Sequence, residues 1–336
     1  MTTRKLGPFT VGAIGLGCMN ICHAYGEPST VAEAERLIAE AVDIGVTHFD
    51  TAALYGFGAS EEIVGRVLKP HRDRIMLASK GGMAGVKGAD NVMRRVINGR
   101  PDALRRNVED SLRRLGTDVI DLYYLHRWDK SVPIEESIGA LGDLVRKGDL
   151  RTLGVSEVSA ATLRKAHKEH PITAIQTEYS LWVRNPEIAV LDACRELDIA
   201  FVAFSPVARG FLAGSVTDLA GLPAKDIRHT MPRFQPENFE RNVKLVPAFA
   251  EIAADAGCTP AQFALAWVLQ KAPFIHAIPG TRSPAHLAEN MEAAGIRLTA
   301  AEIARAEDLI NPRSVIGNRY GAQARAEVDT EEFPDA

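Results

Sequence analysis

The chain has 336 residues, of which 46% are hydrophobic and 24% charged, an ordinary mixture for a globular protein that excludes a disordered or fibrous chain. The 39 basic and 43 acidic residues give a net charge of −4, so the overall field attracts neither nucleic acid nor an anionic membrane. Four cysteines are too few for a disulfide framework, and no apolar run reaches about 18 residues. We therefore expect a soluble, cytoplasmic protein that binds neither nucleic acid nor membranes; its oligomeric state is not predicted.

The cysteines do not predict a metal site. Cys18 and Cys22 lie beside His23, which superficially suggests one. Cys194 and Cys258, however, lack the paired spacing of a structural zinc site. We expect no bound metal.

The chain opens with a segment, 4–13, that is typical of a hairpin around a Gly-Pro turn. Apolar runs then alternate with segments of helical periodicity such as 31–42, 102–115 and 160–169, which predicts a parallel sheet. The runs expected to form buried strands are 14–19, 46–51, 75–80, 120–126, 150–156, 173–179, 199–205 and 275–280. Eight strand-plus-helix units predict a single (β/α)₈ barrel domain over 1–336, with its core at about 14–310.

A doubly wound sheet is the alternative architecture for this alternation. Its dinucleotide-binding fingerprint is absent, because the glycines of 12–17 stand in the wrong order and no helix follows them directly. These glycines are better explained as residues that let a strand pass close to its neighbours.

Three segments depart from the regular repeat. Residues 81–101 are rich in glycine and basic residues, and 207–258 contain a long loop with prolines. Long segments after a barrel strand usually form the rim of the active site, so we expect rim loops here. Residues 311–336, which contain Pro312 and Pro334 and end in acidic residues, are interpreted as a rim or surface tail.

Polar residues stand at the carboxyl ends of several predicted strands. Asp50, Lys80 and His126 each close an apolar run. Singly, each has an ordinary structural explanation: Asp50 as a helix cap, Lys80 as a cation that reaches solvent, His126 as a hydrogen-bonded core residue. Together they occupy equivalent positions on the face where barrel enzymes place their catalytic groups. The pattern therefore predicts a catalytic cluster.

Tyr55 follows Asp50 by five residues and is expected in the loop above the second strand. A buried ammonium at Lys80 would lower the pKa of the phenol, and Asp50 would hold that ammonium in place. These three residues then form a proton donor, and His126 adds a hydrogen bond to the oxygen that Tyr55 protonates.

Over nearly its whole length the sequence resembles the aldo-keto reductase family. The matching motifs are Phe49-Asp50-Thr51-Ala52 with Tyr55-Gly56, Ala78-Ser79-Lys80, Asp121-Leu122-Tyr123-Tyr124-Leu125-His126, Gly154-Val155-Ser156, Gln176-Thr177-Glu178-Tyr179-Ser180, Phe204-Ser205-Pro206 with Arg209-Gly210, and Ile278-Pro279-Gly280-Thr281-Arg282. Pro232-Arg233-Phe234 with Glu237-Asn238-Phe239 is similar to a long-loop branch of broad-specificity aldehyde and ketone reductases.

The resemblance implies a (β/α)₈ barrel that uses NADP(H) to reduce aldehydes and ketones reversibly, with a small-molecule carbonyl compound as its partner. It implies that Asp50, Tyr55, Lys80 and His126 are the catalytic residues and that Tyr55 is the general acid. The implied cofactor residues are Ser156, Glu157 and Gln176 at the carboxamide, Phe204 stacked on the nicotinamide, Ser205, Pro206, Arg209 and Gly210 at the diphosphate, and Gly280, Thr281, Arg282, His286, Glu289 and Asn290 at the adenosine end.

Three of these positions depart from the family pattern. Glu157 stands where many relatives have Asn, Phe204 where Tyr is frequent, and His286 where Arg or Gln is frequent. An ionised Glu157 accepts from the carboxamide nitrogen but donates nothing to its oxygen, so Ser156 would supply that donor.

Arg282 is expected to select NADPH over NADH. It follows the last predicted strand and precedes a helix that opens at Ser283-Pro284. A guanidinium at a helix start, with hydroxyl groups beside it, suits the 2′-phosphate that only NADP carries.

The substrate pocket is the least determined part of the prediction. Its candidates are Met19, Asn20, Tyr25, Trp128, Trp182 and the 207–235 loop with Phe211 and Phe234. The aromatic side chains among them favour a carbonyl compound with an apolar body. Each of these side chains is equally compatible with packing at the barrel mouth.

Two other functions are compatible with a barrel. One is a regulatory protein that binds the cofactor with little turnover, which the intact catalytic set disfavours. The other is a serine hydrolase, but Gly154-Val155-Ser156-Glu157-Val158 lacks the final glycine of a nucleophile elbow.

Overall fold

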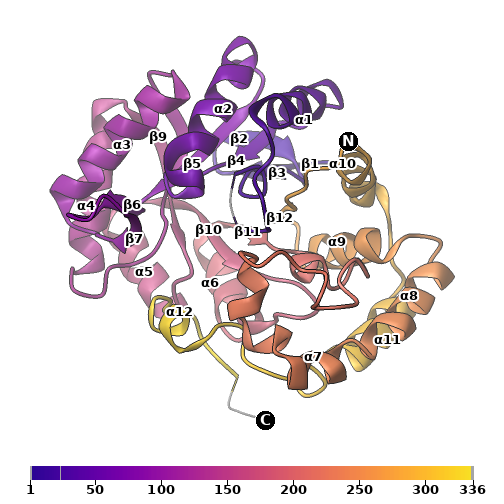
Figure 1. Cartoon of the computed structure of the whole chain (residues 1–336). Coiled ribbons are helices and arrows are strands. Elements are labelled where there is room, and N and C mark those ends of the chain that lie inside the picture. Colours follow the sequence, from indigo (N-terminus) through magenta and orange to yellow (C-terminus); the bar gives the residue numbers. More distant parts are fainter. Residues whose placement is uncertain (1, 23, 334–336) are drawn as a thin grey trace.

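A computed structural model describes residues 2–22 and 24–333, so His23, Pro334 and the end of the acidic tail lie outside the described residues. Parallel strands form a central barrel that is surrounded by helices (Figure 1). The barrel strands are β3 (Leu16–Gly17), β4 (His48–Asp50), β5 (Met76–Gly81), β8 (Ile120–Leu125), β9 (Leu150–Ser156), β10 (Ile172–Glu178), β11 (Ala200–Phe204) and β12 (Ile275–Ile278). The structure confirms the predicted (β/α)₈ barrel.

The eight strands are hydrogen-bonded in chain order from β3 to β12. A parallel bridge between Ile14 and Ala277 joins the first strand region to the last, so the two edges of the sheet meet. Close approach on both sides of the first strand requires glycine: a Cβ on Gly17 would lie 2.8 Å from the Ile278 carbonyl oxygen at the seam, and one on Gly15 would lie 2.7 Å from the His48 carbonyl oxygen of β4. The glycines of 12–17 therefore serve strand packing, as predicted.

Helices cover the outside of the barrel, and most of them are amphipathic and bury one face. They are α1 (Val31–Asp43), α2 (Ala59–Leu68), α3 (Pro101–Leu115), α4 (Ile134–Lys147), α5 (Ala160–Glu169), α6 (Val190–Leu197), α9 (Pro260–Gln270) and α10 (Pro284–Glu292). Their starts follow local sequence signals. Thr30 and Thr259 form capping boxes with Glu33 and Gln262, which satisfies amide groups that a helix start leaves unpaired.

A hairpin of β1 (Thr3–Leu6) and β2 (Phe9–Gly12) lies against the amino-terminal end of the barrel. Its buried Leu6 and Val11 pack in one cluster with inward-facing strand residues such as Met76, Leu122 and Val202. Because this end of the barrel is filled with apolar side chains, the opposite end is the one available for a site.

The remaining elements lie around that opposite end or extend the outer layer. They are the antiparallel hairpin β6 (Met83–Lys87) and β7 (Met93–Ile97), and the helices α7 (Pro236–Asn242), α8 (Leu245–Asp255), α11 (Ala300–Leu309) and α12 (Ala322–Ala326). Part of 81–101, which we expected to be a loop, is thus a paired hairpin. Among the described residues no single helix is long and apolar enough to cross a membrane. The helical segments 236–255 and 260–270 reach that length and apolar character only when the two are taken together across a bend.

Candidate active site

Asp50, Lys80 and Tyr55 meet at the carboxyl end of the barrel. The Lys80 ammonium donates to the Asp50 carboxylate, to the Thr51 carbonyl oxygen at 2.8 Å and to the Tyr55 hydroxyl at 3.2 Å. Asp50 is the last residue of β4 and Lys80 the last but one of the neighbouring β5, while Tyr55 begins a short 3₁₀ turn, Tyr55–Gly58, directly above β4. All three side chains are buried, so their charges and dipoles act with little screening by water.

His126 lies on the other side of the phenol. It follows β8, and its ring packs edge-to-face against Tyr55 with the ring centroids 5.9 Å apart. Its side chain is also buried, yet both His126 and Tyr55 line an open cavity. The four predicted catalytic residues are therefore assembled at one place, although they come from three strands and one loop.

The pKa of Tyr55 differs from our expectation. Burial raises the pKa of the phenol more than the nearby Lys80 ammonium lowers it, so the pKa lies above 10.0, the ordinary value. Burial lowers the pKa of Lys80, but Asp50 and Tyr55 outweigh this effect and the pKa lies above 10.5. At neutral pH the site thus contains a protonated phenol next to an ammonium ion, which is the state that a proton donor requires.

A cavity of about 1180 Å³ runs from these residues across the mouth of the barrel. Its lining includes almost the whole predicted cofactor set, namely Ser156, Gln176, Phe204, Ser205, Pro206, Arg209, Gly210, Gly280, Thr281, Arg282, His286, Glu289 and Asn290. Met19, Asn20 and Tyr25 of the expected substrate pocket also line it.

The part of the cavity nearest the catalytic residues combines an aromatic ring with polar groups. The half-buried Phe204 presents its ring there, and Ser156 and Gln176 line the same region. The Gln176 amide nitrogen donates one hydrogen to Asp50 at 2.8 Å, which holds the amide group at the edge of the cavity. A flat ring that carries a carboxamide fits these contacts.

The middle of the cavity contains the loop after β11. Ser205 and Arg209 adopt left-handed backbone conformations, with φ of 49° and 58°, which strain non-glycine residues and are typical of functional sites. Arg209 is held by an ion pair with Glu178 at 2.9 Å and by a hydrogen bond to the Tyr25 hydroxyl at 3.2 Å. A fixed cation of this kind suits a diphosphate group.

The far end of the cavity suits a phosphate. Ser283 caps α10 by accepting from the His286 amide, and its own amide donates to the Thr281 hydroxyl at 3.0 Å. Arg282 is exposed and donates to the Glu27 carbonyl oxygen at 2.7 Å, which leaves other guanidinium hydrogens for a ligand. Donors from one end of the cavity to the other therefore fit an extended anionic dinucleotide.

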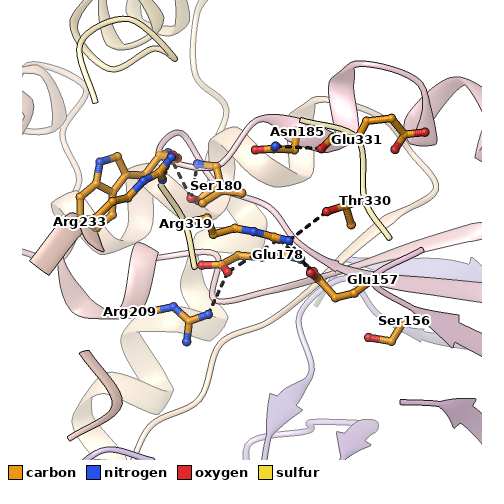
Figure 2. A network of polar contacts seen from close by, with 12 residues as sticks. Ser156, Glu157, Glu178, Ser180, Asn185, Arg209, Arg233, Arg319, Thr330 and Glu331 are labelled. Carbon is orange, nitrogen blue, oxygen red and sulfur yellow. Dashed lines mark hydrogen bonds and ion pairs between the residues drawn. The ribbon is translucent and has the colours of Figure 1, made fainter. Parts of the chain in front are cut away.

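Glu157 is the exception among the expected cofactor residues. It does not line the cavity but is buried in a double hydrogen bond with Arg319, at 3.0 and 2.5 Å (Figure 2). Burial raises the pKa of Glu157, but Arg319 and Arg127 outweigh it, so the carboxyl group stays ionised. The expected contact to a carboxamide is replaced by an ion pair with the carboxy-terminal segment, which the sequence pattern of β9 could not reveal.

Four aromatic residues of the expected substrate pocket, Trp128, Trp182, Phe211 and Phe234, do not line the cavity. Trp182 is 4% exposed and stacks on Phe211 with ring centroids 3.9 Å apart, and Phe234 packs edge-on against it. Trp128 is half-buried, and its indole nitrogen donates to the Val132 carbonyl oxygen at 2.9 Å. Trp182, Phe211 and Phe234 pack against one another, and a role of these four residues in substrate binding stays a prediction.

Sequence reasoning missed several residues of the cavity wall. They are Leu54, Met83, Arg95, Arg127, Arg228, Tyr320 and Glu327 with their neighbours in 321–324. Arg127 follows His126 directly and could have been found from that position. The others belong to rim segments, whose contacts depend on how distant parts of the chain pack. In the part of the chain that the structure describes, no group of three or more His, Cys, Asp or Glu could hold a metal ion.

Comparison with known proteins agrees with this geometry. Residues 13–311 match the model of the aldo/keto reductase family. The chain is 40% identical over 339 residues to aldo-keto reductase yakc of Schizosaccharomyces pombe, whose name specifies NADP(+), and the match covers 99% of this chain and 98% of that protein.

Comparison with solved structures also indicates this family. A glycerol dehydrogenase from Gluconobacter oxydans superimposes with a TM-score of 0.84 at 31% identity, covering 95% of this chain and 98% of that one. An aldo/keto reductase from Klebsiella pneumoniae, solved with NADP and acetate, has a TM-score of 0.71 at 28% identity, covering 95% and 98%. This chain belongs to the aldo/keto reductase family.

Proposed function

We propose that this protein is an NADPH-dependent reductase of aldehydes and ketones in which Tyr55 donates the proton. The observation that carries the proposal is the buried contact between the Lys80 ammonium and the Tyr55 hydroxyl, at the edge of a cavity long enough for a dinucleotide. Family membership and the NADP(+) in the name of the yakc relative support the choice of cofactor.

NADPH, when bound, supplies a hydride to the carbonyl carbon. The Tyr55 hydroxyl gives its proton to the carbonyl oxygen, so that an alcohol forms. The Lys80 ammonium lies 3.2 Å from that hydroxyl and stabilises the negative charge that develops on the phenol oxygen. Asp50 holds the ammonium, and Gln176 holds the other carboxylate oxygen of Asp50. In the reverse direction the deprotonated Tyr55 takes the alcohol proton.

The residues that would hold the cofactor are those that line the cavity away from Tyr55. Phe204 offers its ring face to the nicotinamide, and Ser156 and Gln176 offer polar groups to the carboxamide. Arg209 offers a positive charge to the diphosphate, while Thr281 and Arg282 offer donors to the 2′-phosphate.

Substrates would enter beside Met19, Leu54, Tyr55 and Met83, where apolar side chains line the cavity. This wall supports carbonyl compounds with an apolar body and the long-loop, broad-specificity branch of the family. We also propose that the chain forms one barrel domain and acts in the cytoplasm.

The test is a panel of aldehydes and ketones with purified protein, followed by NADPH absorbance and repeated with NADH. We expect turnover of several aromatic aldehydes and a preference for NADPH. Tight NADPH binding without turnover of any carbonyl compound would favour a regulatory role and would contradict the proposal.

A further inference from the structure

The guanidinium of Arg127 is an unpaired cation in the catalytic part of the cavity. Arg127 follows His126 directly, lines the cavity and is half-buried. Its Nη1 donates to the His126 carbonyl oxygen at 2.7 Å and to the Ser156 hydroxyl at 3.3 Å. Among the described residues, 2–22 and 24–333, no carboxylate oxygen lies within 4.0 Å of a guanidinium nitrogen of Arg127. Arg127 therefore forms no ion pair with them.

Three other arginines of the cavity wall differ from Arg127 in this respect. Arg95 pairs with Glu327 at 2.5 Å, Arg209 with Glu178 at 2.9 Å and Arg228 with Asp226 at 2.7 Å. Arg282 has no carboxylate partner either, but it lies at the adenosine end, where the proposed 2′-phosphate would be its partner.

Both hydrogen bonds of the Arg127 guanidinium come from Nη1, so its other N–H groups have no partner in the described chain. Arginine carries five N–H donors in a planar fork, and only Nη1 has partners in the described chain. A half-buried cation loses hydration, which is costly unless an anion or an acceptor replaces the water. The Glu157 carboxylate is near enough for the charge of Arg127 to lower its pKa, but it forms no ion pair with Arg127, and Arg319 binds both of its oxygens.

The positive charge of Arg127 affects the pKa of Tyr55, the proposed proton donor. Burial raises the pKa of the Tyr55 phenol, Lys80 is the largest charge that opposes this, and Arg127 lowers the pKa further. Because Arg127 follows His126 and its Nη1 donates to Ser156, an anion bound to it would lie in the part of the cavity that Tyr55 and His126 also line. A positive charge near the nicotinamide is unfavourable to the oxidised, cationic ring, so the cofactor alone does not account for this residue.

We propose that Arg127 binds a carboxylate carried by the carbonyl substrate, and that the enzyme prefers aldehydes or ketones with such a group a few bonds from the carbonyl carbon. The free Nη2 and Nε donors form two parallel hydrogen bonds to the carboxylate. This selects the substrate class and also orients the carbonyl towards Tyr55 and His126. The inference rests on the proposed function.

The test compares charged and neutral aldehydes of the same shape. The substrates are 3- and 4-carboxybenzaldehyde, each paired with its carboxamide analogue, and benzaldehyde as a reference. The quantity measured is the ratio of kcat/KM for acid over amide at saturating NADPH. For the wild type we expect a ratio of about ten or more for at least one position of the carboxylate, the scale of hydrogen bonds to a charged group.

Arg127→Gln should lower this ratio about ten-fold or more, mainly through KM of the acid, and Arg127→Lys should retain part of it because it keeps the charge. Arg95→Gln is the matched control: it removes a cavity guanidinium that is already paired with Glu327, and the ratio should be preserved. NADPH affinity, measured by quenching of protein fluorescence, shows whether each variant still folds and binds cofactor.

A wild-type ratio near one for both positions, or an equal loss for acid and amide in Arg127→Gln, would overturn the proposal. Weaker NADPH binding in Arg127→Gln at an unchanged ratio would also overturn it, because Arg127 would then be a cofactor residue. Absence of turnover even with benzaldehyde in the wild type would instead reject the proposed function. The two failures are thus distinguishable.

Discussion

Tyr55 and Lys80 form a buried pair in which the ammonium lies 3.2 Å from the phenol oxygen. Because burial outweighs the effect of Lys80, the pKa of Tyr55 stays above 10.0, and the hydroxyl remains protonated across the neutral range. In the proposed mechanism Lys80 stabilises the phenolate as it forms. It does not generate a phenolate in the resting protein.

Tyr55→Phe should remove most carbonyl reduction, by a factor of at least about 10², because it deletes the proton donor. The NADPH dissociation constant should change little, since no proposed cofactor contact is lost. Steady-state kinetics and a fluorescence titration measure the two quantities. A kcat within a few-fold of the wild type would contradict the assignment of Tyr55.

Arg282 offers a residue-scale test of cofactor choice. Arg282→Ala should weaken NADPH binding by about 1.5–3 kcal/mol and leave NADH binding nearly unchanged, because only NADPH carries the phosphate that the guanidinium would bind. Binding titrations with both cofactors give the comparison. Equal losses would indicate that the hydrogen bond from Arg282 to the Glu27 carbonyl oxygen only supports the loop.

At the scale of elements, the carboxy-terminal segment is part of the site. Residues 320–324 and Glu327 line the cavity, and Arg319 joins the segment to Glu157 at the end of β9 (Figure 2). The Asp329 amide donates to the Glu157 carbonyl oxygen at 3.0 Å, and its carboxylate accepts from the Ser159 hydroxyl at the start of α5 at 2.9 Å. These contacts attach the segment to the barrel rim.

Arg319→Met should lower the free energy of unfolding, or of local opening of this segment, by about 3–5 kcal/mol, because Glu157 would remain as a buried, unpaired charge. Urea unfolding and hydrogen exchange at the Asp329 amide measure the two quantities. Arg325→Met is the matched control: its ion pair with Glu332 is largely exposed and should contribute less than about 1 kcal/mol. Similar effects of both substitutions would contradict this role of Arg319.

At the scale of the whole molecule, two buried histidines connect the stability of the barrel to pH. Desolvation by burial lowers the pKa of His48 to about 3 and that of His276 to about 4. Nitrogens of His276 lie 3.1 and 3.4 Å from the Lys5 and Gly12 carbonyl oxygens of the amino-terminal hairpin. In the unfolded chain both rings would take up protons near pH 6.5.

Between pH 6.5 and these lowered values the unfolded state binds more protons than the folded state, so acid favours unfolding. The stabilisation is complete above pH 6.5 and is lost as the pH falls towards 4. From about pH 7 to about pH 5 we expect each histidine to remove about 2 kcal/mol from the free energy of unfolding. Urea unfolding of the wild type and of His276→Gln, which should lose about half of this dependence, tests the effect.

His229→Gln is the control for that experiment, because His229 is exposed on the rim. It should leave the pH dependence of unfolding as in the wild type. A His276→Gln protein with the same dependence as the wild type would mean that other groups, such as paired carboxylates, control acid unfolding.

The sequence by itself determined the barrel and the meeting of the proposed catalytic residues at one of its ends. Alternating apolar runs and amphipathic helices predict eight units, and the polar residues that end those runs, such as Asp50, Lys80 and His126, meet because parallel strands end on one face of a barrel. These features depend on local periodicity and on topology, and both can be inferred from a single sequence. The resemblance to the aldo/keto reductase family was confirmed by the comparisons.

The tertiary structure alone decided what surrounds this cluster. Whether Glu157 faces a cofactor or pairs with Arg319, and whether Trp182 lines the cavity or stacks on Phe211, depends on contacts between residues far apart in the chain. The direction of the pKa shift at Tyr55 likewise depends on how completely the phenol is buried. Periodicity reports which residues are buried, but not which partner each one meets, because that partner is set by the packing of rim segments whose sequences carry no regular repeat.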